Sequence, residues 1–187
     1  MAHAQGREAL LTVGHGAQSS EDFLALLAGQ DIGVLVDVRR HPGSRRHPHF
    51  GRQALSQLLT AHSIEYRWEE ALGGRRHGTA GSPNVALRDP SFRAYADYMA
   101  SAPFREAVAG VVRESRASST AVMCAESVWW RCHRRLIADY CVLATGTPVL
   151  HLFHDGRLRE HHLTDGVRAV GETVIYDLGA DRELPEA

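Results

Sequence analysis

Residues 121–140, AVMCAESVWWRCHRRLIADY, form the stretch that decides the fold. Its first three residues belong to an apolar run that predicts a buried strand, and the apolar residues from Cys132 onward recur at helical spacing. The junction between them holds cysteines, a carboxylate, a histidine, tryptophans and arginines. A strand that passes into a helix is the repeating unit of an α/β protein. This stretch therefore predicts the architecture and a place where reactive side chains gather.

The same alternation of strands and helices extends outward along the chain. The predicted strands cover residues 10–13, 34–38, 64–68, 120–123 and 149–153, and the predicted helices start near Ser19 and cover 53–62, 91–100, 103–115 and 131–143. This order predicts a single three-layer α/β/α domain, Rossmann-like, with a mostly parallel sheet of about five strands. We expect the domain to span residues 1–165, and residues 166–187 to form a partly ordered C-terminal extension.

The composition is typical of a globular protein. Of 187 residues, 44% are hydrophobic and 23% are charged. No apolar run approaches the ~20 residues that cross a bilayer, and the first residues lack the pattern of a secretion signal. The three cysteines cannot all pair within one chain, which favours reduced thiols. We expect a cytoplasmic protein that has no membrane segment and no cofactor, and the sequence leaves its oligomeric state open.

Positive charge is concentrated in one segment, although the net charge is only -1. Neither Asp nor Glu occurs between Asp37 and Glu65. Five arginines fall there: Arg39, Arg40, Arg45, Arg46 and Arg52. Such a segment predicts a site for an anion, often a phosphate. The alternative is a solvated arginine-rich loop whose charge is balanced elsewhere.

Three polar segments follow predicted strands. Residues 14–16 read Gly-His-Gly, residues 37–40 read Asp-Val-Arg-Arg, and residues 124–126 read Cys-Ala-Glu. Ligands of open parallel sheets bind beyond the carboxyl ends of the strands. We therefore expect the three segments to line one pocket.

Glu126 is the first candidate for a reactive group. It lies between a strand end and a helix start, where the helix dipole stabilises negative charge. It is therefore a candidate nucleophile or general base, with His15 or His133 as its proton partner. The alternative is a carboxylate that only caps the helix.

Cys124 is the second candidate. Residues 34–44, VLVDVRRHPGS, are similar to a rhodanese strand and loop, and Cys124 ends a later strand. A rhodanese- or phosphatase-like thiol enzyme with Cys124 as nucleophile is therefore an alternative. Against it, Glu126 would raise the pKa of a neighbouring thiol, and the loop that follows lacks the glycines typical of anion-binding loops.

Cys132 is open to two interpretations. Helical spacing places it on an apolar face with Leu136 and Tyr140, which predicts a buried and inert thiol. It could instead form part of the pocket wall. The cysteines are spaced eight and nine residues apart, unlike the close pairs of zinc sites, so we predict no metal site.

Several other residues are candidates for binding a substrate anion. They are Gly14, Asp37, Arg39, Arg45, Arg46, Arg75, Cys132 and Arg134. Forked guanidinium groups suit phosphate and carboxylate. Trp129 and Trp130 could stack on a base, although packing is the expected role of at least one of them.

Several motifs together resemble the domain of unknown function 488 family. They are VGHG, LVDVRRHPGSRRHPHF, ALGGRR, YADYM and CAESVWWRCHRRLIADY, and the likeness runs from about Leu11 to about His162. It implies a small bacterial or archaeal cytoplasmic α/β domain. The motif residues carried over are Gly14, His15, Asp37, Arg39, Arg45, Arg46, Gly73, Gly74, Arg75, Cys124, Glu126, Cys132, His133 and Arg134. The resemblance supplies no reaction.

The sequence thus predicts an enzyme, a hydrolase or transferase, that binds a phosphate-bearing nucleotide or nucleic-acid substrate, with Glu126 as base or nucleophile. One alternative is a binding module for nucleic acid or a modified base that carries out no chemistry. The other is the thiol enzyme that uses Cys124.

Overall fold

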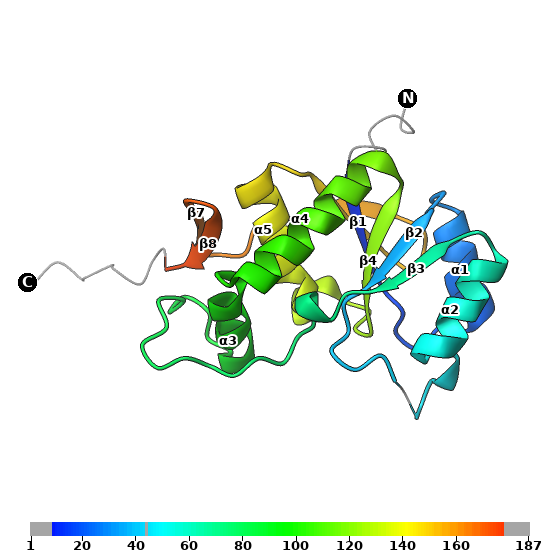
Figure 1. Cartoon of the computed structure of the whole chain (residues 1–187), viewed down its shortest axis with the longest axis horizontal. Helices are drawn as coiled ribbons and strands as arrows, with labels where there is room; N and C mark the ends of the chain where they lie inside the picture. The colour runs from blue at the N-terminus through cyan, green and yellow to red at the C-terminus, as the bar shows by residue number, and fades with distance from the viewer. Residues whose placement is uncertain (1–8, 44, 178–187) are drawn as a thin grey trace, which may run out of the picture.

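The centre of the molecule is a six-stranded sheet with the order β3-β2-β4-β1-β5-β6 (Figure 1). The structure, a computed structural model, describes residues 9–43 and 45–177. The strands are β1 (Leu10–Gly14), β2 (Val34–Asp37), β3 (Glu65–Trp68), β4 (Thr120–Cys124), β5 (Val149–Leu152) and β6 (Leu158–Glu160). The first five are parallel, and β6 pairs with β5 in the antiparallel direction.

The prediction of about five strands omitted β6. This strand has three residues, all exposed, so it shows no apolar alternation that a sequence pattern could detect. It is held by its backbone pairing with β5 at the edge of the sheet.

Helices cover both faces of the sheet, which confirms the predicted three-layer, Rossmann-like domain. The helices α1 (Ser20–Ala28) and α2 (Arg52–Ala61) pack on one face, against Leu11 and Val13. The helices α3 (Pro90–Met99), α4 (Ala102–Ala117) and α5 (Arg134–Thr145) belong to the core on the other face, which includes Leu10 and Cys124. None of the helices in the described ranges is long and apolar enough to cross a membrane.

The helix α5 begins later than the sequence pattern predicted. A 3₁₀ turn, η4 (Trp129–Arg131), precedes it, and Cys132 is extended with φ −125 and ψ 152. His133 then occupies the N-cap position. The prediction that Cys132 shares a helix face with Leu136 was therefore wrong, because helical spacing does not apply to an extended residue.

The described part of the predicted C-terminal extension packs against the domain. The strands β7 (Val167–Val170) and β8 (Thr173–Tyr176) form a hairpin next to α3 and α5. Tyr176 is fully buried, and its hydroxyl donates to Asp139 on α5 at 2.9 Å. The rest of that extension, 178–187, lies outside the described residues.

Candidate active site

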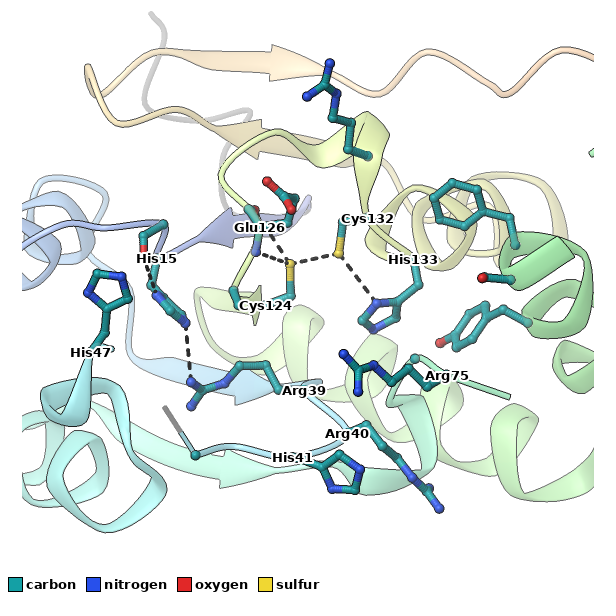
Figure 2. A pocket seen from close by; sticks show the side chains of 18 of the residues that line it. His15, Arg39, Arg40, His41, His47, Arg75, Cys124, Glu126, Cys132 and His133 are labelled. Atoms are coloured by element: carbon teal, nitrogen blue, oxygen red, sulfur yellow. Dashed lines mark hydrogen bonds between the residues drawn. The ribbon is translucent and has the colours of Figure 1, made fainter. Parts of the chain in front are cut away.

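A cavity of about 830 Å³ opens at the carboxyl ends of the central strands (Figure 2). Its wall consists of His15, Gly16, Arg39, Arg40, His41, Gly43, Arg46, His47, Gly74, Arg75, Ser91, Phe92, Tyr95, Cys124, Ala125, Glu126, Arg131, Cys132 and His133. The chain leaves β1 toward one edge of the sheet and leaves β4 toward the other, so the strand order reverses between these two neighbours. A crevice is expected at this point, and the three segments that follow β1, β2 and β4 meet there as predicted.

The wall is strongly cationic. Among the described residues, one carboxylate, that of Glu126, lines it, against five arginines: Arg39, Arg40, Arg46, Arg75 and Arg131. Of the predicted anion-binding residues, four belong to the wall: Arg39, Arg46, Arg75 and Cys132. The other four, Gly14, Asp37, Arg45 and Arg134, do not line it.

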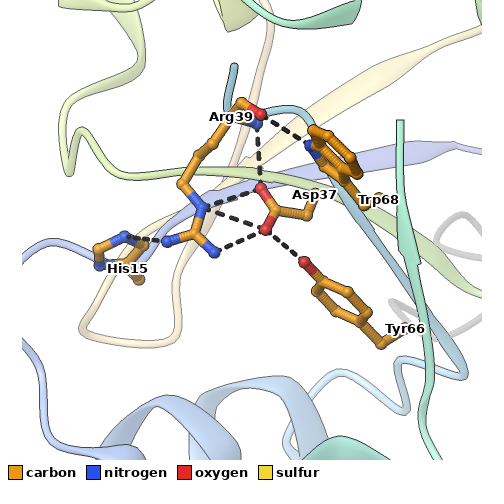
Figure 3. A network of polar contacts seen from close by, with 5 residues as sticks. All are labelled: His15, Asp37, Arg39, Tyr66 and Trp68. Carbon is orange, nitrogen blue, oxygen red and sulfur yellow. Dashed lines mark hydrogen bonds and ion pairs between the residues drawn. The ribbon is translucent and has the colours of Figure 1, made fainter. Parts of the chain in front are cut away.

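Asp37 acts on the wall through Arg39 (Figure 3). This carboxylate is fully buried at the end of β2, and its two oxygens accept from Nε and Nη2 of Arg39 at 2.9 and 2.6 Å. The hydroxyl of Tyr66 donates to the same carboxylate at 2.7 Å. Asp37 therefore holds the guanidinium of Arg39 at the edge of the cavity and is not itself free to bind an anion.

His15 continues this network. Its Nδ1 lies 2.9 Å from the carbonyl oxygen of Gly16, which can only accept, so Nδ1 carries the proton. Its Nε2 then accepts from Nη1 of Arg39 at 3.3 Å. Burial, together with the charge of Arg39, lowers the pKa of His15 to about 4. In this structure His15 is a neutral ring that orients Arg39, which leaves it no free nitrogen as proton partner for Glu126.

Two thiols meet on the floor of the cavity. Sγ of Cys124, the last residue of β4, lies 2.8 Å from Sγ of Cys132. Both side chains are buried, with 2% and 7% exposed, yet both line the cavity. The extended conformation of Cys132 before α5 turns its side chain back toward the strand end. Sequence spacing gave no sign of this contact.

Arg134 lies behind the thiol pair. Only 1% of its side chain is exposed, and its Nε donates to Sγ of Cys124 at 3.0 Å. Its other donors reach Oγ1 of Thr12 at 3.2 Å and the carbonyl oxygen of Glu126 at 2.6 Å. Within the described ranges it makes no ion pair with a carboxylate. The positive charge of a buried guanidinium requires a compensating group, and the pair of thiols in front of Arg134 is the group that can supply it by losing one proton.

The two thiols of the pair have unequal pKa values. Burial and the hydrogen bond with Cys132 raise the pKa of Cys124 well above its usual range. Burial also acts to raise the pKa of Cys132. The hydrogen bond from Cys124 and the charge of Arg134 outweigh it and lower that pKa to about 7. These directions make Cys132 the more acidic thiol of the pair, and Cys124 the thiol that can donate to it.

His133 lies beside Cys132 and can accept a hydrogen bond from its thiol. Its Nε2 lies 3.1 Å from the carbonyl oxygen of Val38 and must donate to it, which leaves a lone pair on Nδ1. That Nδ1 lies 3.5 Å from Sγ of Cys132. Burial lowers the pKa of His133, so the ring is neutral and its Nδ1 can accept a hydrogen bond from the thiol.

A buried chain of hydrogen bonds supports Arg134 from behind. Asp139 contacts Nε2 of His161 at 2.8 Å, and Nδ1 of that ring lies 2.9 Å from Nε2 of His151. Nδ1 of His151 is 2.6 Å from the hydroxyl of Thr12, which accepts from Arg134. When each imidazole carries one proton, each group donates to the next: Arg134 to Thr12, Thr12 to His151, His151 to His161, and His161 to Asp139. The chain therefore fixes the orientation of the Thr12 hydroxyl and, through it, of Arg134.

Glu126 contributes its backbone to this arrangement. Its N–H donates to Sγ of Cys124 at 3.3 Å, and its carbonyl oxygen accepts from Arg134. Its side chain is exposed at the rim of the cavity. The structure thus places the carboxylate where it can reach a ligand, but without the buried polar partners that the two thiols have.

Two motif glycines allow these close approaches. A Cβ on Gly14 would collide with the carbonyl oxygen of Glu126 and with the guanidinium of Arg134. A Cβ on Gly74 would lie 3.0 Å from Nδ1 of His133. Glycine at both positions lets the loop of Glu126 and the ring of His133 take the places described above.

The comparisons with known proteins identify the family. Residues 19–141 match the family Domain of unknown function DUF488. The chain belongs to this family. The match contains Asp37, the basic segment and the Cys124–Arg134 junction, and it excludes the Gly-His-Gly turn after β1. Neither curated proteins nor solved structures gave a match.

The DUF488 motif residues leave part of the site unexplained. Sequence reasoning did not select Phe92 or Tyr95, which line the cavity from α3, and it did not select Arg131, although this residue directly precedes Cys132. It also missed His151, whose place inside an otherwise apolar strand was the available signal. Among the described residues of this DUF488 member, no three His, Cys, Asp or Glu side chains are grouped to hold a metal ion.

The two tryptophans of the junction have different environments. Trp129 stacks on His151 with ring centroids 4.1 Å apart, so it is a packing residue. Trp130 is 45% exposed. It borders a second groove, of about 490 Å³, that shares Phe92 with the main cavity.

Proposed function

We propose that this protein is an enzyme that binds a phosphate-bearing substrate in the cationic cavity and attacks it with the thiolate of Cys132. The observation that carries the proposal is a pair of buried thiols on the floor of that cavity, one of which accepts from the guanidinium of Arg134, which makes no ion pair with a described carboxylate. A thiolate is a strong nucleophile, and a water-poor cationic site favours both the thiolate and an anionic substrate. Reduced thiols fit the cytoplasmic location that we propose for it.

This proposal replaces Glu126 with a thiol as the attacking group. The side chain of Glu126 is exposed, whereas Cys132 has a neighbouring base in His133 and a hydrogen-bond donor in Cys124. It also exchanges the roles of the two cysteines, since the sequence favoured Cys124 as the nucleophile. The lower pKa and the greater exposure of Cys132 support that exchange.

The class of substrate follows from the walls. Arg75 and Arg131 are exposed, line the cavity, and make no ion pair with a described carboxylate. They are therefore available to a phosphate. Trp130, at the adjoining groove, offers a face on which a base could stack, so a nucleotide is the phosphate compound that we favour.

Protection from alkylation tests this proposal. Iodoacetamide should modify Cys132, and inorganic phosphate and adenosine 5′-monophosphate should slow that reaction in a saturable way, the nucleotide at lower concentration. The variants Arg75→Gln and Arg131→Gln should weaken this protection roughly 10-fold, because each removes a charge-assisted hydrogen bond. The site of modification is read by peptide mass spectrometry.

Arg113→Gln is the matched control, because Arg113 is an exposed arginine of α4 that does not line the cavity. Protection should be unchanged in this variant. If neither phosphate nor nucleotide slows the alkylation of Cys132, or if Arg113→Gln weakens protection as much as the cavity variants, the proposal is wrong. Binding without any modification of Cys132 would favour the non-catalytic binding module.

A further inference from the structure

A single thiol nucleophile does not explain why two thiols touch. Cys124 and Cys132 come from different elements, the end of β4 and the segment before α5, and their sulfur atoms are 2.8 Å apart. Cys141, the third cysteine, is fully buried within α5 and does not line the cavity. The structure thus separates one reactive pair from one core thiol.

We propose that Cys132 and Cys124 act as attacking and resolving thiols, and that the protein reduces a disulfide bond in a small anionic molecule. The inference rests on the proposed function for the thiolate and the cationic cavity, and it adds a second reacting residue and a substrate class. The cavity volume, about 830 Å³, suits a small molecule.

The first step consumes the thiolate. Sγ of Cys132 attacks one sulfur of the substrate R–S–S–R, a Cys132–S–S–R bond forms, and R–S⁻ leaves. The leaving thiolate takes up a proton and becomes R–SH. The arginines of the wall, such as Arg75 and Arg131, hold the negative groups of R while the bond is exchanged.

The second step requires Cys124, and Arg134 prepares it. Nε of Arg134 lies 3.0 Å from Sγ of Cys124 in this structure. Once Cys132 is bound in the mixed disulfide, the pair has lost its negative charge. The guanidinium then favours the ionised form of Cys124. This thiolate attacks Sγ of Cys132, forms the Cys124–Cys132 disulfide and expels the second R–S⁻. The proton of Cys124 and one from solvent convert both leaving groups to R–SH, so the substrate gains two electrons and the pair loses two.

Arg134 also sets how the pair is restored. In the disulfide form Nε of Arg134 is the charged group beside Cys124, so it stabilises Cys124 as the leaving thiolate when a small thiol attacks Cys132. A thiol that leaves readily speeds this exchange. Two molecules of a small monothiol therefore regenerate Cys124 and Cys132 and form one new disulfide.

Dialkyl disulfides of different charge test the inference. Reduced full-length protein is mixed with 3,3′-dithiodipropionate, bis(2-hydroxyethyl) disulfide or cystamine, which carry carboxylate, hydroxyl and ammonium groups. Peptide mass spectrometry follows Cys124 and Cys132, and each rate is divided by that of the same disulfide with a free small thiol. We expect the Cys124–Cys132 disulfide to form and no part of the probe to remain bound to the protein. The relative rate should be at least ~10-fold higher for the dianion than for the dication.

Single variants separate the two roles. Cys124→Ser should stop at a stable mixed disulfide on Cys132, and Cys132→Ser should react slowly. Arg131→Gln should reduce the preference for the dianion, and Arg113→Gln should keep it. The inference is overturned if the wild-type protein retains the probe, or if the dianion and the dication close the pair at the same relative rate.

The test does not depend on the phosphate experiment. Closure by the carboxylate probe without protection by phosphate or nucleotide would overturn the phosphate-bearing substrate and leave the dithiol chemistry standing. Protection by phosphate together with a persistent mixed disulfide would support the phosphate-bearing substrate and overturn the dithiol chemistry.

Discussion

His15 and His151 are buried imidazoles whose charge states are set by burial and by their neighbours. Burial and the charge of Arg39 lower the pKa of His15 to about 4, and burial with nearby His161 and Arg134 lowers that of His151 to about 2. The guanidinium of Arg134 donates to Sγ of Cys124. Two neutral rings and one hydrogen bond to sulfur therefore hold the floor of the cavity together.

The neutral state of His15 predicts acid sensitivity. The unfolded chain binds a proton at His15 near the ordinary pKa of 6.5, but the folded protein does so only near pH 4. Stability is therefore complete above pH 6.5 and is lost as the pH falls from 6.5 toward 4, by roughly 3 kcal/mol from His15 at pH 4. Urea unfolding at several pH values should show His15→Gln losing roughly 1 kcal/mol less per pH unit in this range. His62→Gln, at an exposed position, should keep the wild-type slope, and an unchanged slope in His15→Gln would contradict the account.

At the scale of the elements, the strand-to-helix junction positions the chemistry. The strand β4 ends at Cys124, the loop of Glu126 crosses the end of β1, and α5 starts with Arg134 directed beneath the loop. Helical periodicity predicted α5 but set its start at residue 131. Periodicity describes regular elements only, so it could not place Cys132, whose contact with Cys124 depends on an extended residue.

The contact between β1 and this loop predicts opposite effects for two glycine variants. Gly14→Ala should lower the free energy of unfolding by about 1–3 kcal/mol, because its Cβ meets the carbonyl oxygen of Glu126. Gly110→Ala is the matched control inside α4, where an added Cβ meets nothing. It should raise the free energy of unfolding by about 1 kcal/mol, because alanine favours a helix. Equal effects of the two variants in urea unfolding would show that the close approach at Gly14 is absent.

At the scale of the whole molecule, the C-terminal hairpin completes the core. Tyr176 of β8 is fully buried, and Asn84 accepts from its backbone N–H at 3.0 Å. The hydroxyl of Tyr176 donates to Asp139, which also ends the hydrogen-bond chain that leads to Arg134. The hairpin, at the periphery of the fold, thus contacts the hydrogen-bond chain that lies behind the candidate active site.

Two substitutions of Tyr176 measure this contribution. Tyr176→Phe removes one donor from a buried carboxylate and should cost about 1–2 kcal/mol. Tyr176→Ala also removes the ring and should cost about 3–5 kcal/mol. Equilibrium unfolding in urea gives both values. A loss below ~0.5 kcal/mol for Tyr176→Ala would show that the hairpin does not pack on α5 in solution.

The sequence predicted more of the fold than of the site. Apolar strands and helical spacing were sufficient for the three layers, and the parallel sheet brought His15, Arg39 and Cys124 together. The roles within the site were less accessible. The sequence predicted that Arg134 binds the substrate, but its side chain is buried and donates to the thiol of Cys124. The supporting chain joins Thr12, His151 and Asp139 from distant segments, and no local pattern links them.

The central claim is that Cys132 is a thiolate near neutral pH because Cys124 and Arg134 stabilise its charge. The most direct measurement is the pH dependence of the alkylation of Cys132 by iodoacetamide, followed by peptide mass spectrometry in the wild-type protein and in Arg134→Met and Thr12→Val. The wild-type rate should level off above a midpoint at about pH 7. The midpoint should rise by at least ~1 unit in Arg134→Met and by less in the milder Thr12→Val. A wild-type rate that still increases through pH 9, as for an ordinary thiol, would contradict the account.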